Sequence, residues 1–157
     1  MQESIKDMFS MHFSMLKEEL GEINTEVLLK SMTLLELPAG RNLTRYRMPV
    51  DSTYFIVGGS VEVTVDEGKG VITLEHSLGH GHLLGEVSAL SGDYLASATV
   101  TTVTPSRFLR LRHQALEELL TSNQDISTIL LRYFVLMLSD RLRKAYQLES
   151  SFVLSNA

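Results

Sequence analysis

The spacing of apolar residues changes twice along the chain and divides it into three parts. In residues 3–20 and 125–149 apolar side chains recur every three or four positions, the spacing of an amphipathic helix. Between them, apolar and polar residues alternate in short runs interrupted by glycine and proline, as in strands joined by turns. We expect a single domain over residues 1–157. Its parts are N-terminal helices (1–32), a β-roll (33–112) and C-terminal helices (113–150).

The N-terminal pattern predicts a helix over residues 3–20 that stops at Gly21, because apolar positions keep helical spacing up to that glycine. A second short helix is predicted over residues 24–32, with Asn24 or Thr25 as its cap.

The middle of the chain predicts an antiparallel sandwich or barrel. Residues 52–65 contain an apolar run, the pair Gly58-Gly59 and an alternating run, which indicate a strand, a tight turn and a half-buried strand. A returning strand follows over 71–79, and residues 97–112 supply two more, broken at Pro105. At least six short strands at this spacing favour a mainly β fold of the jelly-roll type, flanked by helices.

The C-terminal part predicts a short helix over 113–123 and one long helix from about Asp125 to Glu149. The long helix carries two apolar stripes. One consists of Leu131, Val135, Leu138, Leu142 and Ala145, and the other of Leu130, Phe134 and Met137.

One face of a roll covers only one such stripe, so a partner is expected on the other. We predict a homodimer through this helix, with Phe134 and Met137 near its axis. In the alternative, the amphipathic N-terminal helix folds back and covers the second stripe.

Composition excludes several classes of function. The chain has no cysteine, which rules out disulfides, thiolate nucleophiles and cysteine-ligated zinc. Its formal net charge of −5 argues against direct DNA binding. No apolar run approaches the roughly 18 residues that span a membrane, and no signal peptide is recognisable, so a cytoplasmic location is expected. The five histidines lack the context of a nucleophile, and no enzyme is expected.

His80, His82 and Glu86 suggest one alternative, a metal-dependent cupin enzyme. Alternate strand residues point to one side, so both imidazoles could face one ion with the carboxylate. The spacing resembles the first cupin motif, but Leu74 stands where that motif has glycine. The one later histidine, His113, begins a predicted helix and not a strand.

Four motifs in order resemble the cyclic-nucleotide-binding domain family, which includes the sensor domain of catabolite activator protein. The resemblance covers about residues 35–142, and Arg47 departs from it where a strand-turn glycine is expected. The motifs are LPAGRNL (37–43), DSTYFIVGGSVEV (51–63), LGHGHLLGEVSALSG (78–92) and ATV (98–100).

The resemblance implies a pocket for a cyclic nucleotide, cAMP or cGMP. A short helix over 85–91 faces the roll interior, where its free backbone N–H groups stabilise a phosphate. Gly85 leaves room for close approach, and Glu86 would accept hydrogen bonds from the ribose 2′-hydroxyl. The residues expected to line this pocket are Gly85, Glu86, Val87, Ser88, Ala96 and Ser97.

The phosphate-binding arginine of the family is missing. Its position is Ala96, or Leu95 if the alignment shifts by one residue, and no lysine or arginine lies between Lys69 and Arg107. A charge-assisted hydrogen bond contributes about 1.5–3 kcal/mol, so its loss weakens binding roughly ten- to a hundred-fold. Arg141, on the long helix, could pair with Glu86, reach a ligand, or be a solvent-exposed arginine in the run SDRLRK.

The family threonine that contacts the purine corresponds to Ala145, a further lost polar contact. The expected function is therefore a non-enzymatic regulatory domain that resembles a stand-alone sensor module and binds cAMP weakly or not at all. A degenerate domain that acts only through an unknown protein partner is the related alternative. Because the chain ends at Ala157, soon after the long helix, no helix-turn-helix is expected.

Overall fold

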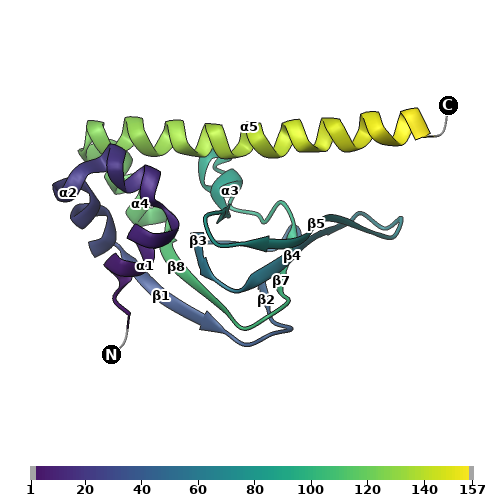
Figure 1. Cartoon of the computed structure of the whole chain (residues 1–157), viewed down its shortest axis with the longest axis horizontal. Coiled ribbons are helices and arrows are strands. Elements are labelled where there is room, and N and C mark those ends of the chain that lie inside the picture. The colour runs from purple at the N-terminus through teal and green to yellow at the C-terminus, as the bar shows by residue number, and fades with distance from the viewer. Residues whose placement is uncertain (1–2, 156–157) are drawn as a thin grey trace.

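The computed structural model describes residues 3–155, and the side chains of residues 3–147. Helices flank a two-sheet roll, and α5 runs along the whole length of the molecule (Figure 1). The helices are α1 (Ile5–His12), α2 (Ser14–Lys30), α3 (Glu86–Ser91), α4 (His113–Ser122) and α5 (Gln124–Ser155). The strands are β1 (Met32–Leu37), β2 (Asn42–Thr44), β3 (Ser52–Gly58), β4 (Ser60–Asp66), β5 (Val71–Gly79), β6 (Leu83–Leu84), β7 (Thr99–Thr102) and β8 (Ser106–Arg112).

The eight strands form two four-stranded sheets in which every neighbouring pair is antiparallel. One sheet has the order β1-β8-β3-β6, and the other has the order β2-β7-β4-β5. This confirms the predicted mainly β fold with flanking helices and a long C-terminal helix. The prediction of a barrel needs correction, because between residues 3 and 155 no ladder of hydrogen bonds joins the two sheets into a closed cylinder.

A tight turn joins β3 to β4, as predicted, but the two strands do not pair with each other. The two strands belong to different sheets, so the chain crosses from one sheet to the other at Gly59. This glycine has a φ of 78°, and an added Cβ would overlap the carbonyl oxygen of Pro105 and the side chain of Ser106. Gly59 therefore permits both the left-handed turn and the close contact with the start of β8.

β3 is buried on both faces and separates two apolar clusters. Tyr54 and Ile56 belong to the cluster between the two sheets, whereas Phe55 and Val57 belong to the cluster beneath the helices. This follows from the alternation of side chains along a strand. The first sheet thus lies between the second sheet and the helical layer, and β3 contributes side chains to both apolar clusters.

The N-terminal helices form one layer with α5, although the predicted single helix over 3–20 is broken. Phe13 has φ −130° and ψ 44°, which ends α1, and its ring packs against Phe9 and Phe55 in the core. Gly21, with φ 77°, interrupts α2 as predicted, but Asn24 and Thr25 lie inside that helix and do not cap it.

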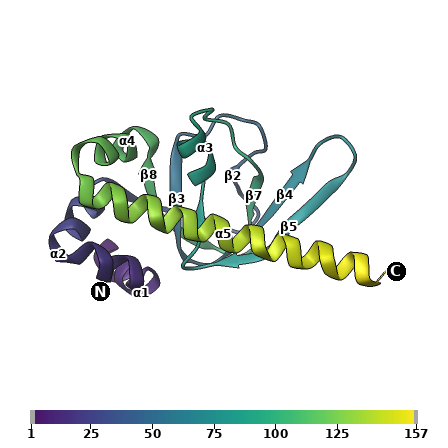
Figure 2. The same cartoon turned by 90° about the horizontal axis from the view of Figure 1, so that it is seen from above.

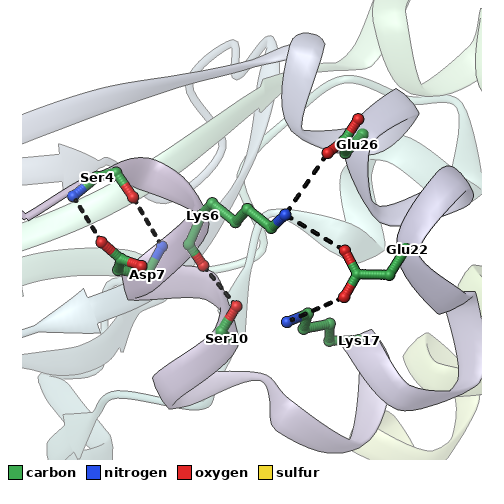
Figure 3. Close-up of polar contacts among 7 residues, drawn as sticks. All are labelled: Ser4, Lys6, Asp7, Ser10, Lys17, Glu22 and Glu26. Atoms are coloured by element: carbon green, nitrogen blue, oxygen red, sulfur yellow. Dashed lines mark hydrogen bonds and ion pairs between the residues drawn. The ribbon is translucent and has the colours of Figure 1, made fainter.

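Polar contacts supplement this apolar packing (Figure 3). Ser4 and Asp7 form a capping box at the start of α1. Lys6 lies 3.3 Å from Glu22 and 3.5 Å from Glu26, so it bridges α1 and α2. Because these ion pairs are exposed, they contribute little to stability, and the buried aromatic rings hold the layer together.

The stripe of α5 that contains Leu130 and Phe134 packs inside the protein, so the prediction of Phe134 at a dimer axis is wrong. Both side chains are fully buried in one cluster with Phe9 and Phe13 of the N-terminal layer, and Met137 packs against that cluster. The fold-back alternative is thus correct for this stripe. The other stripe remains largely exposed in the single chain.

No helix within residues 3–155 combines the length and the apolar character needed to cross a membrane.

Replacing Arg47 with glycine should stabilise the fold. Arg47 has a φ of 61°, a left-handed conformation that costs a non-glycine residue about 1–2 kcal/mol. Glycine removes this strain but adds chain entropy to the unfolded state, so Arg47→Gly should raise the free energy of unfolding by about 0.5–1 kcal/mol in urea titrations. Arg45→Gly, in the same turn at negative φ, is the control and should not stabilise. Equal effects of both changes would contradict this account.

Candidate functional site

A cavity of about 530 Å³ opens between the second sheet, α3 and α5. Figure 1 shows α3 lying between the roll and α5 at this place. Residues from nearly every element of the roll contribute to its wall. They are Thr44, Val50, Val63, Ile72, Thr73, Leu74, Glu75, Leu78, Leu84, Gly85, Glu86, Val87, Ser88, Ala96, Ser97, Ala98, Val100, Arg141, Lys144 and Ala145.

All seven residues predicted for the site line this one cavity. Gly85, Glu86, Val87 and Ser88 come from the start of α3, Ala96 and Ser97 from the segment before β7, and Arg141 from α5. Sequence reasoning had also placed Ala145 where the family contacts the purine, and this residue lies on the same wall.

Gly85 positions α3 against the first sheet. It caps the helix in the left-handed conformation, with φ 85°, and an added Cβ would overlap the carbonyl oxygen of Ser52. The need for glycine at this position therefore comes from β3 packing beneath it, in addition to any approach of a ligand. At the other end, the Ser88 hydroxyl donates to the Leu95 carbonyl at 2.5 Å, which ties α3 to the segment that leads to β7.

Glu86 and Arg141 form an ion pair at the inner end of the cavity. The Glu86 side chain is 1% exposed, and its Oε1 lies 2.7 Å from Nη1 of Arg141. The Nη2 of the same guanidinium donates to the Leu83 carbonyl of β6. One arginine of the long helix thus joins α3 and β6, as one of the three sequence hypotheses for Arg141 proposed.

The ion pair is electrostatically costly to bury. Burial raises the pKa of the Glu86 carboxyl above its ordinary value, and the nearby Arg141 guanidinium opposes this shift only in part. Two polar atoms of the pair, Oε2 of Glu86 and Nε of Arg141, are buried without a hydrogen-bond partner among the described side chains. Both atoms are enclosed by the protein, so their missing hydrogen bonds add to the cost of burying the pair.

The segment around Ala96 supplies no positive charge to the cavity. Ala96 is buried, and its backbone pairs with Met48 and Arg47 across the turn before β3. The second cation on the cavity wall, Lys144, is exposed and pairs with Asp140 at 3.3 Å.

The three residues of the metal hypothesis do not form a site. The His80 ring lies 4.6 Å from the ring of His12 on α1, whereas Glu86 pairs with Arg141. His113 begins α4, as predicted, and is buried at the end of β8. In the described part of the chain, no three histidine, aspartate or glutamate side chains gather as metal ligands. The structure thus offers nothing in favour of the cupin alternative.

Sequence reasoning missed the contribution of β5 to the cavity. Ile72, Thr73, Leu74 and Glu75 form one side of it, and Lys144 closes it from α5. Ile72 and Leu74 are 60% and 51% exposed, although the pattern indicated an ordinary returning strand. The sequence offered no clear signal for this wall, because it shows two aliphatic residues one position apart but not that they remain exposed.

A family model and a curated relative both match this chain. The family model described as "Cyclic nucleotide-binding domain" matches residues 34–123. The potassium channel AKT2 of rice (Oryza sativa subsp. japonica) is 33% identical over 116 residues, which is 72% of this chain and 14% of the channel. The chain therefore corresponds to a small part of this curated relative.

Two solved structures show the same fold. A cyclic nucleotide-binding domain from Methylobacillus flagellatus superposes with a TM-score of 0.76 at 25% identity, covering 88% of this chain and 80% of that one. The catabolite activator protein of Thermus thermophilus superposes with a TM-score of 0.69 at 23% identity, covering 88% of this chain and 62% of that one.

Removing Arg141 should destabilise the protein strongly. Arg141→Ala leaves the buried Glu86 carboxylate without its counter-charge, and breaking a buried pair in this way costs about 3 kcal/mol. The double variant Glu86→Leu/Arg141→Leu removes both charges and should remain within about 1 kcal/mol of the original protein. Urea unfolding at pH 7 measures both changes.

Lys144→Ala is the matched control for these two variants, because it breaks an exposed ion pair on the same helix. Its effect should stay below about 0.5 kcal/mol. A double variant as unstable as Arg141→Ala would show that packing, and not the buried charge, explains the loss.

Proposed function

Because the chain belongs to the cyclic nucleotide-binding domain family, we propose that it is a non-enzymatic regulatory module whose pocket binds cyclic nucleotides weakly or not at all. The observation that carries this proposal is the Glu86–Arg141 pair. The carboxylate at the ribose position already has a partner from the protein itself. The position of the phosphate-binding arginine holds Ala96.

The charges of the pocket support this proposal. A cyclic phosphate carries a negative charge, and burying it without a cation is unfavourable. Arg141 could serve as that cation only by leaving Glu86, which would strand a carboxylate that is 1% exposed. The N-terminus of α3 and the Ser97 hydroxyl remain as donors, and they are weaker than a guanidinium.

We place the module in the cytoplasm, where it would pass its signal to a protein partner. In this proposal the chain reads no DNA itself, in keeping with its net charge of −5. A variant of the same proposal is a domain that has lost its nucleotide entirely and works through protein contacts alone.

Isothermal calorimetry with cAMP and cGMP tests the proposal. The original chain should bind cAMP with a dissociation constant above the micromolar range. Ala96→Arg should bind it ten- to a hundred-fold more tightly, because it restores one charge-assisted hydrogen bond. Leu95→Arg is the matched control, since Leu95 does not line the cavity. Submicromolar cAMP binding by the unaltered chain would refute the proposal.

We also propose that the module forms a two-fold dimer through the exposed stripe of α5. Leu131, Val135, Leu138 and Leu142 follow one another at steps of four, three and four residues, the spacing of a coiled-coil seam. Val135 and Leu142 are 57% and 54% exposed in the single chain. Such an apolar stripe is unfavourable in water, and a second copy of α5 would cover it.

Leu142→Asp should dissociate this dimer. Each leucine buried at the seam contributes about 1.5–3 kcal/mol, and the symmetry doubles the loss, so the dissociation constant should rise at least about a hundred-fold. Sedimentation velocity at micromolar concentration measures it. Ile23→Asp, which changes an exposed apolar residue of α2, is the control. A monomeric original chain, or a dimer that tolerates Leu142→Asp, would contradict the proposed interface.

A further inference from the structure

Exposed apolar side chains surround α3 on the outside of the roll. Three segments of the chain carry them: the turn before β3, α3 itself and the segment after α3. Figure 2 shows α3 beside α5 and not beneath it, so the long helix leaves the outer side of α3 uncovered. We call these side chains the α3 surface, which consists of Met48, Val87, Leu90, Tyr94 and Leu95. Apolar groups gathered in this way mark sites of interaction.

Backbone and side-chain contacts hold the three segments side by side. The Ala96 amide donates to the Met48 carbonyl at 2.9 Å, and Pro49 forms an isolated antiparallel bridge with Leu95. On the other side of the same segment, the Ser88 hydroxyl of α3 donates to the Leu95 carbonyl. The five apolar side chains therefore share one region of the molecule and are not scattered over it.

Two arginines border the α3 surface at the turn before β3. Arg45 and Arg47 are both exposed, and neither has an ion-pair partner among the described side chains. The carboxylates near this turn already accept hydrogen bonds from the protein. Asp93 accepts from the backbone amide two residues later, and Glu67 accepts from the Tyr46 hydroxyl. The two guanidinium groups are thus available to an acidic partner.

The opposite border of the α3 surface also carries positive charge. There the Tyr94 ring lies 6.1 Å from the ring of His113, measured between centroids. The preceding residue, Arg112, is largely exposed and shares the carboxylate of Asp51 with Arg110. One carboxylate thus serves two guanidinium groups. In a chain with a net charge of −5, both borders of this surface favour negatively charged groups.

Backbone strain points to the same surface independently of exposure. Among residues 3–155, the non-glycine residues with positive φ are Arg47, at 61°, and Tyr94, at 57°. This conformation is costly for a residue with a Cβ, and such strain gathers where a side chain is held for a function. Arg47 supplies a charge of the α3 surface, and Tyr94 supplies its aromatic ring.

We propose that the α3 surface binds an acidic amphipathic helix of a partner protein, with its apolar side chains on the five apolar residues and its carboxylates on Arg45 and Arg47. This inference rests on the proposed function, in which the module passes its signal to a protein. Val87 belongs both to this surface and to the cavity wall. The partner would therefore contact the same short helix that borders the cavity.

A peptide fits this surface better than an anionic membrane does. Membrane sites of this kind typically gather about four to eight lysines and arginines. The α3 surface offers Arg45 and Arg47 without ion pairs and Arg112 with a shared one. An apolar centre with a few basic residues at its border instead matches the recognition of an amphipathic helix.

A fluorescein-labelled synthetic peptide tests the surface. The peptide has leucine at helical spacing and glutamate at all other positions, and fluorescence anisotropy follows its binding to the full chain. We expect saturable binding. Two control peptides should bind at least about ten-fold more weakly. One has the same composition in scrambled order, and the other has lysine in place of each glutamate.

A pair of matched double variants locates the binding. Arg45→Glu/Leu90→Asp should weaken binding of the peptide at least about ten-fold, because it reverses one charge of the surface and removes an apolar contact. Arg41→Glu/Val103→Asp makes the same kinds of change at the other end of the paired strands β2 and β7, and it should bind as the original chain does. Circular dichroism establishes that both variants are folded.

Arg47→Gly separates binding from stability. This variant is expected to stabilise the fold, yet it should weaken peptide binding about five-fold, because it removes one guanidinium from the surface. Arg47→Lys keeps the positive charge and should restore most of the affinity. A purely structural role of Arg47 would leave peptide binding unchanged in both variants, which would contradict the proposed contact.

The outcomes separate this inference from the proposed function. If the peptide does not bind, or if the two double variants bind it equally, the α3 surface is not the site proposed here. Binding to vesicles of phosphatidylcholine and phosphatidylserine in equal parts, lost in Arg45→Glu/Leu90→Asp, would make it a membrane site and also overturn the inference. Weak cAMP binding would in both cases still support the proposed function. Submicromolar cAMP binding overturns the proposed function, whereas the peptide result decides the α3 surface by itself.

Discussion

A carboxylate buried at the start of α3 is the constraint on which the rest of the site depends. Glu86 needs a positive charge within contact distance, and the cassette around it has none. The charge comes from Arg141, 55 residues later, on α5, which also lines the cavity. The second contact of Arg141, to the Leu83 carbonyl, extends the link to β6. The pocket and the long helix therefore form one structural unit.

This unit also decides what the cavity can accept. In the described part of the wall, both basic side chains are paired with acidic residues of the protein, so the cavity is close to neutral and largely aliphatic. The fold of a cyclic nucleotide-binding domain is retained, including the left-handed Gly85 and the short helix α3. A shared fold preserves the shape of the pocket, while the side chains on its wall determine what the pocket can bind.

Local pattern predicted the elements well and their partners poorly. The strands were visible from alternation, and α3 from resemblance, because both depend on neighbours in sequence. The partners of β3 could not be predicted, because the pair Gly58-Gly59 fits a hairpin turn as well as a crossing between two sheets. Similarly, two stripes of α5 looked equivalent, and only the packing of Phe9 and Phe13 shows that Phe134 is internal. The sequence suggested Arg141 as a partner of Glu86 but could not establish the contact, because it does not show how far apart residues 86 and 141 lie in the fold.

The pairing of β1 with β8 and of β2 with β7 has a consequence for how the chain folds. β1 pairs only with β8, so Met32 can pair with Leu111 only after most of the roll has been synthesised. Similarly, β2 cannot pair until β7 is present. Contacts between residues this far apart in sequence close large loops, which slows folding compared with a chain of simple hairpins. During synthesis, the first strand to leave the ribosome remains an unpaired edge until β8 has emerged. That interval exposes Leu35 and Leu37, which lie on the inner side of the finished roll, to aggregation with other nascent chains.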